Sequence, residues 1–174
     1  MKVFLNIFVT ALLMNLELFC GNAGLSLGLP LFGATYFFVT FSPIHGAVSA
    51  TLSALLLDVM YMGNCLTWPF FAMLAVFLTG NFAKYLQRQM PLSPLGSGAL
   101  CALLVFTYNF FHALFSGVPA PGPDFFSMLV FQLAGGALFM TFMVWLFDAI
   151  NFRCNLPKFC TAENKKNRLN GGRL

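Results

Sequence analysis

The sequence predicts an all-α integral membrane protein, a compact bundle of about six transmembrane helices. First, 59% of its 174 residues are hydrophobic and only 8% are charged, whereas a soluble domain carries about a quarter charged residues. Second, apolar runs of membrane-spanning length alternate with clusters of Gly, Pro and Asn. Third, six spans place every Lys and Arg on one side of the bilayer.

The first three spans end at recognisable breaks. The first span is followed by a Gly-Asn-Ala-Gly turn and the third by Gly63-Asn64. The second ends before Pro43, because proline disfavours helix in the residue that precedes it. We therefore predict helices over residues 3–20, 25–41 and 44–62.

The last three spans are separated by proline-rich connectors. Pro69 falls in the first turn of the fourth span, where a missing N–H is tolerated. The segments 87–96 and 117–123 contain five of the nine prolines and are expected to be connectors. The predicted spans are 66–85, 97–116 and 125–147. Residues 1–150 then form one transmembrane domain, and the polar segment 151–174 is expected to be a basic, disordered tail.

The basic residues determine the orientation. Six of the nine lie in the last 22 positions, and the other three are Lys2, Lys84 and Arg88. With six spans they share a face with both termini, so the positive-inside rule predicts that both the N- and the C-terminus are cytoplasmic. A basic tail of this kind favours anionic lipid over nucleic acid as its partner. Cleavage of the first span as a signal peptide stays an alternative, although the run is long and contains Glu17.

Three ionisable residues, Glu17, Asp58 and His112, interrupt apolar runs one turn before the predicted outer ends. An ionisable group at membrane depth indicates function by default. With Asn109, these residues are candidates for an outer-leaflet polar cluster. Alternatively, each reaches interfacial water independently.

A stripe of small residues leads to Asp58. Gly46, Ala50 and Ala54 precede it at four-residue spacing, which places all four on one helix face. Small residues allow another backbone to approach closely. The stripe therefore predicts either packing within the bundle or binding of a partner helix.

The sequence lacks the motifs of the common enzyme classes. It has no HExxH, no phosphate-binding glycine loop and no Ser-His or Cys-His arrangement with a nearby Asp. The five cysteines include no CxxC pair. We therefore expect a non-enzymatic protein without a metal site or a cofactor.

The stretch 45–85, HGAVSATLSALLLDVMYMGNCLTWPFFAMLAVFLTGNFAKY, resembles the rod shape-determining protein MreD family. The shared features are small residues at Ala50 and Ala54 leading to Asp58, an outer turn with Gly63, and a basic connector from Lys84. Length and span number are also similar to that family.

The resemblance implies a subunit of the bacterial cell-elongation machinery. Such a subunit binds an MreC-like single-span protein and scaffolds the complex that synthesises lateral peptidoglycan. The alternative is the substrate-binding subunit of an energy-coupling vitamin or small-molecule transporter, with a polar pocket that opens outward. A third possibility is another membrane protein of envelope assembly or an intramembrane enzyme.

Overall fold

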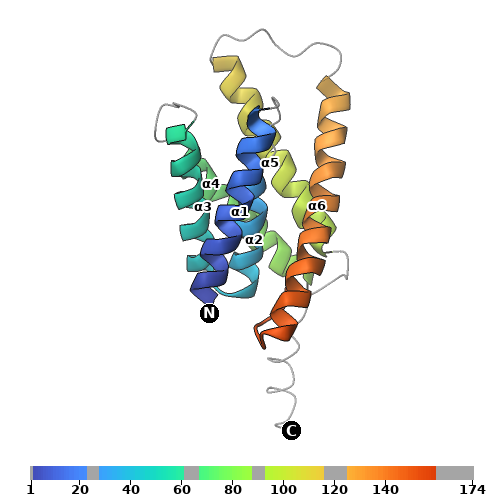
Figure 1. Cartoon of the computed structure of the whole chain (residues 1–174). Coiled ribbons are helices and arrows are strands. Elements are labelled where there is room, and N and C mark those ends of the chain that lie inside the picture. Colours follow the sequence, from blue (N-terminus) through green and yellow to red (C-terminus); the bar gives the residue numbers. More distant parts are fainter. Residues whose placement is uncertain (1, 23–27, 61–66, 88–92, 116–124, 160–174) are drawn as a thin grey trace.

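The computed structural model describes residues 2–22, 28–60, 67–87, 93–115 and 125–159. These residues form an all-helical bundle (Figure 1), which confirms the predicted fold class. The helices are α1 (Lys2–Asn22), α2 (Leu29–Thr40), α3 (Pro43–Met60), α4 (Thr67–Gln87), α5 (Ser93–Phe115) and α6 (Phe125–Arg153). Helices α3 to α6 are long and apolar enough to cross a membrane, and α1 and α2 have shorter apolar stretches. The chain is a multi-pass helical membrane protein.

Four helices begin with a proline in their first turn. Pro30, Pro43, Pro69 and Pro94 occupy these positions in α2, α3, α4 and α5. The first turn tolerates proline because its N–H groups have no partner within the helix. For this reason α5 begins at Ser93, before the predicted start at residue 97.

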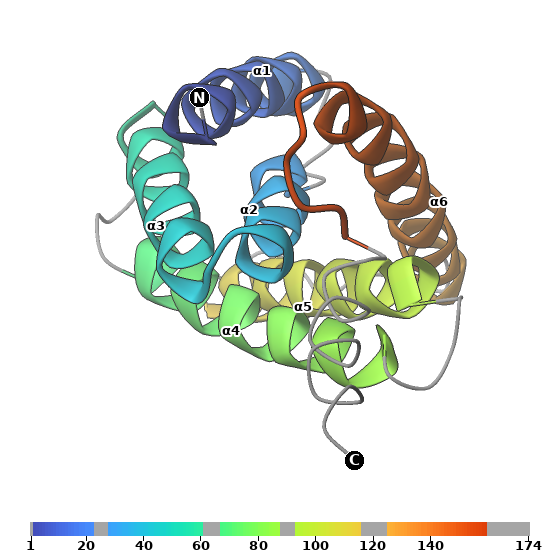
Figure 2. The same cartoon turned by 90° about the horizontal axis from the view of Figure 1, so that it is seen from below.

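Helix α2 is the centre of the bundle. The other five helices surround it when the molecule is viewed along its long axis (Figure 2), and all of its residues from Leu29 to Thr40 are buried. Twelve residues of helix are roughly 18 Å long, against about 30 Å of bilayer hydrocarbon. α2 is therefore a core helix enclosed by protein along its whole length.

Close approach of the surrounding helices depends on glycine. A Cβ on Gly46 of α3 would lie 2.7 Å from the Ala34 carbonyl oxygen, and one on Gly80 of α4 would lie 2.2 Å from the Phe38 ring. The hydroxyls of Thr35 and Thr79 form a 2.8 Å hydrogen bond between α2 and α4. α2 thus packs almost backbone to backbone against α3 and places its large Phe38 side chain over a glycine of α4.

Helices α5 and α6 cross at a second pair of glycines. A Cβ on Gly98 would meet the Gly136 carbonyl oxygen at 2.6 Å, and a Cβ on Gly136 would meet the Ala102 Cβ at 2.5 Å. Gly135, the next residue in the chain, has no atom within 4 Å of its ideal Cβ position. Only one of these two neighbouring glycines of α6 is therefore required by packing.

The chain continues as part of the bundle beyond the predicted domain boundary at residue 150. α6 ends at Arg153, and Asn155 then adopts a left-handed φ of 53°. The Leu156 N–H donates to the Asn151 carbonyl at 2.8 Å, as in a Schellman helix end. Residues 151–156 continue the bundle through these contacts, and residues 160–174, the larger part of the predicted tail, lie outside the described part of the chain.

A network of hydrogen bonds centred on Tyr36, which we call the polar node, holds this segment against α2. The Tyr36 hydroxyl donates to Asp148 Oδ1 at 2.8 Å, and the Phe159 N–H donates to the same oxygen at 2.8 Å. Asn151 Nδ2 donates to the Tyr36 hydroxyl and to the Pro157 carbonyl. The Phe159 ring is fully buried and stacks on Tyr36, with centroids 5.8 Å apart. We call residues 154–159 the return segment.

Both ends of the described chain lie at one end of the bundle. α1 begins there and α6 ends there (Figure 1). Lys84 in the last turn of α4 and Arg153 in the last turn of α6 lie at this same end. We call it the basic end. Arg88 and the basic residues from 165 onward fall outside the described residues.

Candidate functional site

The small-residue stripe of α3 faces the interior of the bundle. Gly46 lies against Phe38 and Ala34 of α2, and Ala50 and Ala54 are buried. The structure therefore assigns the stripe to helix packing, one of the two predicted roles. The side chains of Ala50 and Ala54 on this face are buried within the bundle and are inaccessible to an external partner.

Asp58 lies at the far end of this stripe, in the last turn of α3, and is half-buried. Its Oδ2 is buried and has no hydrogen-bond partner among the residues that the structure describes. The neighbouring residues 61–66, which include Gly63, lie outside the described part of the chain.

Glu17 caps helix α2. Its carboxylate is buried, with Oε1 accepting from the Gly28 N–H at 3.0 Å and Oε2 from the Leu29 N–H at 2.9 Å. Gly28 has a left-handed φ of 68°, and a Cβ there would lie 2.6 Å from Val105 Cγ2. The first N–H groups of a helix lack partners within it, and the helix dipole favours a negative charge beside them. Glu17 therefore has a structural role.

The four residues of the predicted outer polar cluster lie on three helices that do not all contact one another. Asn109 and His112 lie on α5, which packs against α2, α4 and α6, whereas Glu17 and Asp58 lie on α1 and α3. His112 is exposed and its ring centroid is 6.0 Å from that of Tyr108. Within the described residues α5 does not contact α1 or α3, so Asn109 and His112 are separated from Glu17 and Asp58.

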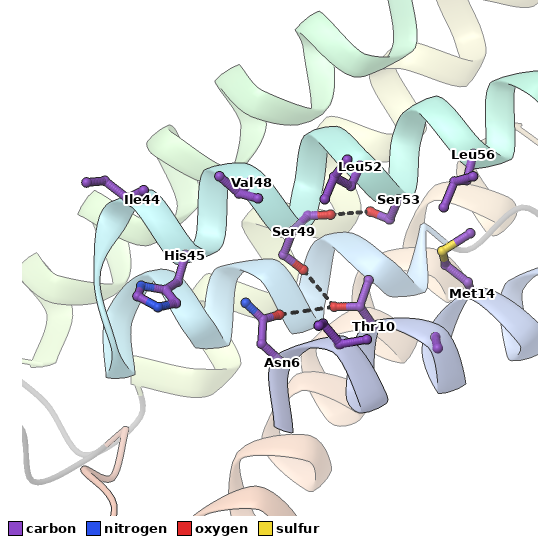
Figure 3. Close-up of a pocket in the computed structure, with 12 residues that line it drawn as sticks. Asn6, Thr10, Met14, Ile44, His45, Val48, Ser49, Leu52, Ser53 and Leu56 are labelled. Carbon is purple, nitrogen blue, oxygen red and sulfur yellow. Dashed lines mark hydrogen bonds between the residues drawn. The ribbon is translucent and has the colours of Figure 1, made fainter. Parts of the chain in front are cut away.

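A groove between α1 and α3 is a feature that the sequence did not reveal (Figure 3). It has a volume of about 490 Å³ and is open on the outer face of the bundle. Its walls include Ile7 of α1 and Val48 and Leu52 of α3, all exposed. The volume falls within the roughly 300–1,000 Å³ typical of small-molecule sites.

Polar side chains lie on the floor of this α1/α3 groove. The hydroxyls of Thr10 and Ser49 form a 2.8 Å hydrogen bond across the two helices, and the Thr10 hydroxyl lies 3.2 Å from Asn6 Oδ1 (Figure 3). Asn6 and Thr10 are four residues apart on α1, and Ser49 lies on the facing helix, α3. The four-residue spacing of Asn6 and Thr10 places both polar side chains on one face of α1. This spacing does not show that the helix facing them is α3.

The outer face of α6 is the second exposed feature. Of the four helices of spanning length, α6 has the smallest buried share. Phe131, Leu138 and Phe142 are exposed on this face at 75%, 67% and 57%. Gly135 lies between them with open space at its Cβ position. These four residues share one helix face, and we call it the α6 outer face.

Among the described residues, His, Cys, Asp and Glu side chains form no group of three that could hold a metal ion. Comparisons with protein-family models, curated proteins and solved structures found no match to this chain.

Proposed function

We propose that this protein is a non-enzymatic membrane subunit of the bacterial cell-elongation machinery. In this role it binds an MreC-like single-span protein and scaffolds the complex that synthesises lateral peptidoglycan. The proposal rests on the resemblance of residues 45–85 to the MreD family and on the α6 outer face. Since the α3 stripe packs internally, α6 is the better candidate for partner binding.

The α6 outer face has the form of a helix-docking surface. Gly135 leaves a notch on this face, and Phe131 and Leu138 stand four and three residues away on either side. In a membrane, helices associate through close packing at small residues, because lipid supplies no hydrophobic driving force. A single-span partner helix can approach the α6 backbone at Gly135 while its side chains pack between the flanking large residues.

The proposed location is the bacterial inner membrane with both termini in the cytoplasm. The basic end carries Lys84 and Arg153, and the cytoplasmic side of a membrane protein is enriched in such residues. The partner's soluble part would then extend from the opposite end of the bundle into the periplasm.

The test is capture of the single-span partner by a Gly135→Leu variant. Leucine enters the notch without a clash at its Cβ, because no atom lies within 4 Å of the ideal Cβ position. We expect co-purification of a tagged MreC-like protein to fall by about tenfold, equivalent to ~1.4 kcal/mol of binding free energy. Ala134→Leu is the matched control, since Ala134 is also exposed on α6 but is rotated by about 100° from Gly135. Equal capture by both variants and the wild type would remove the α6 outer face from the proposal.

The transporter alternative has less support. It requires a polar pocket built from residues such as Glu17, but the Glu17 carboxylate is occupied by the N–H groups of α2. A vitamin-sized ligand that raised the melting temperature of the purified protein would favour this alternative over the scaffold.

A further inference from the structure

The two ends of the α1/α3 groove differ in chemistry. Asn6 and His45 lie in the first turns of α1 and α3, at the basic end of the bundle. Farther along, the groove is lined by apolar side chains such as Met14, Leu52 and Leu56. The groove therefore passes from polar to apolar in the direction from the basic end towards the membrane centre.

His45 presents an N–H group at the polar mouth. Ser42 Oγ accepts from the His45 backbone N–H at 3.3 Å, and the same oxygen lies 2.6 Å from His45 Nδ1. Among the described residues, Nδ1 is the only acceptor that the Ser42 hydroxyl proton reaches, and donation of this proton to Nδ1 places the proton of the neutral imidazole on Nε2. Nε2 is then a donor without a hydrogen bond to any described residue.

Asn6 presents a second donor beside it. Its Oδ1 lies 3.2 Å from the Thr10 hydroxyl, whereas its Nδ2 has no hydrogen bond to any described residue. Figure 3 shows the nitrogen on the His45 side of the Asn6 side chain. An amide without a hydrogen-bond partner is costly next to lipid. Both donors therefore favour an occupant with strong acceptor oxygens.

The length of the groove matches one leaflet. Its lining extends from Ile44 to Leu56 on α3, a helix distance of about 18 Å. One leaflet contributes about half of the roughly 30 Å hydrocarbon core. A lipid acyl chain occupies one leaflet, so the groove has the length of one such chain.

The groove walls also favour a flexible chain over a helix. Gly46 of α3 faces α2, whereas Ile44, Val48 and Leu52 line the groove together with Ser49 and Ser53. The large side chains hold an occupant away from the α3 backbone, and this favours a flexible chain over a closely packed helix. The hydroxyls of Thr10 and Ser49 satisfy each other, so the middle of the groove requires no polar group from its occupant.

We propose that the α1/α3 groove binds a phospholipid from the leaflet at the basic end. One acyl chain lies along the apolar walls, and the phosphate accepts hydrogen bonds from His45 Nε2 and Asn6 Nδ2. The basic residues Lys84 and Arg153 at this end favour an anionic lipid. This inference is independent of the α6 outer face, so partner capture and lipid binding can fail separately.

The test uses native mass spectrometry of the purified full-length protein with added dioleoyl phosphatidylglycerol. Dioleoylglycerol, which has the same acyl chains and no phosphate, is the comparison lipid. Because charge-assisted hydrogen bonds to phosphate are lost, we expect an Asn6→Leu, His45→Phe double variant to retain about tenfold less phosphatidylglycerol than the wild type. Its retention of dioleoylglycerol should be unchanged.

Ala11→Phe tests the apolar part of the groove, since Ala11 is exposed and lines it. This variant should lose both lipids, whereas Ala149→Phe on α6 should lose neither. Wild-type retention of phosphatidylglycerol by both groove variants would overturn the proposal. Equal losses from Ala11→Phe and Ala149→Phe, or a photo-crosslinker at Leu52 that captures protein in place of lipid, would also overturn it.

Discussion

At the scale of single residues, several polar side chains of this bundle have a backbone or side-chain partner, whereas Asp58 Oδ2 is buried without one among the described residues. Ser53 and Thr79 donate to carbonyls in the preceding turn of their own helices. Thr35 and Thr79 pair between helices, and Glu17 accepts from the start of α2. Each arrangement avoids an unpaired group in apolar surroundings, which would cost free energy of the order of 1–3 kcal/mol.

Glu17 is the residue whose removal should destabilise the bundle most directly. Glu17→Leu leaves the N–H groups of Gly28 and Leu29 without their acceptor. Since each unsatisfied buried group costs about 1–3 kcal/mol, we expect a clear fall in the free energy of unfolding. Glu17→Gln keeps one carbonyl acceptor and should be intermediate. The measurement is denaturant unfolding in mixed micelles, followed by circular dichroism.

The neighbouring Asn15 supplies the control for this series. Its amide donates only to the Ala11 carbonyl of its own helix in an exposed position. Asn15→Leu should therefore leave the free energy of unfolding nearly unchanged. A Glu17→Leu variant as stable as the wild type would show that capping by Glu17 contributes no net stability.

At the scale of elements, the notable feature is a short helix enclosed by longer ones. The sequence predicted a span over 25–41, and the structure shows a helix from Leu29 to Thr40 with every residue buried. Hydropathy could not reveal this position, because a helix surrounded by lipid and one surrounded by apolar protein have equally apolar surfaces. The glycines that contact α2, Gly46 and Gly80, come from two different helices. The spacing of residues within a single helix therefore could not predict that both pack against α2.

The return segment should stabilise the basic end of α2. A chain that ends at Leu156 loses the Pro157 carbonyl and the buried Phe159 ring, whereas a chain that ends at Cys160 keeps both. Burial of a phenylalanine side chain contributes about 1.5–3 kcal/mol. We therefore expect a lower melting temperature for the protein truncated after Leu156 than for the protein truncated after Cys160. Differential scanning fluorimetry of the purified variants measures the difference.

Tyr36→Phe in the full chain separates the contribution of the polar-node hydrogen bonds to stability from the contribution of ring packing. This change removes the hydroxyl that joins Asp148 and Asn151 but retains the stacking on Phe159. Its melting temperature should lie between those of the wild type and the Leu156 truncation. Identical melting temperatures for the two truncations would contradict a stabilising role for the return segment.

At the scale of the whole molecule, the sequence predicted the number and order of helices better than their contacts. Apolar runs and prolines located the spans, and basic residues predicted that α1 begins where α6 ends. The partner of Glu17 was not predictable, because it is a pair of backbone N–H groups across a connection. The α1/α3 groove was also not predictable from the sequence, since it depends on which two helices are neighbours.

The orientation of the bundle can be tested with reporter fusions. α1 begins and α6 ends at the basic end, whereas α3 ends and α4 begins at the opposite end (Figure 1). If the basic end is cytoplasmic, as the positive-inside rule predicts, green fluorescent protein fused after Leu174 will fluoresce. Alkaline phosphatase inserted between α3 and α4 will be active, because it folds only in the periplasm. The reverse pattern would place the Lys and Arg residues outside, and with them the proposed lipid site and the return segment.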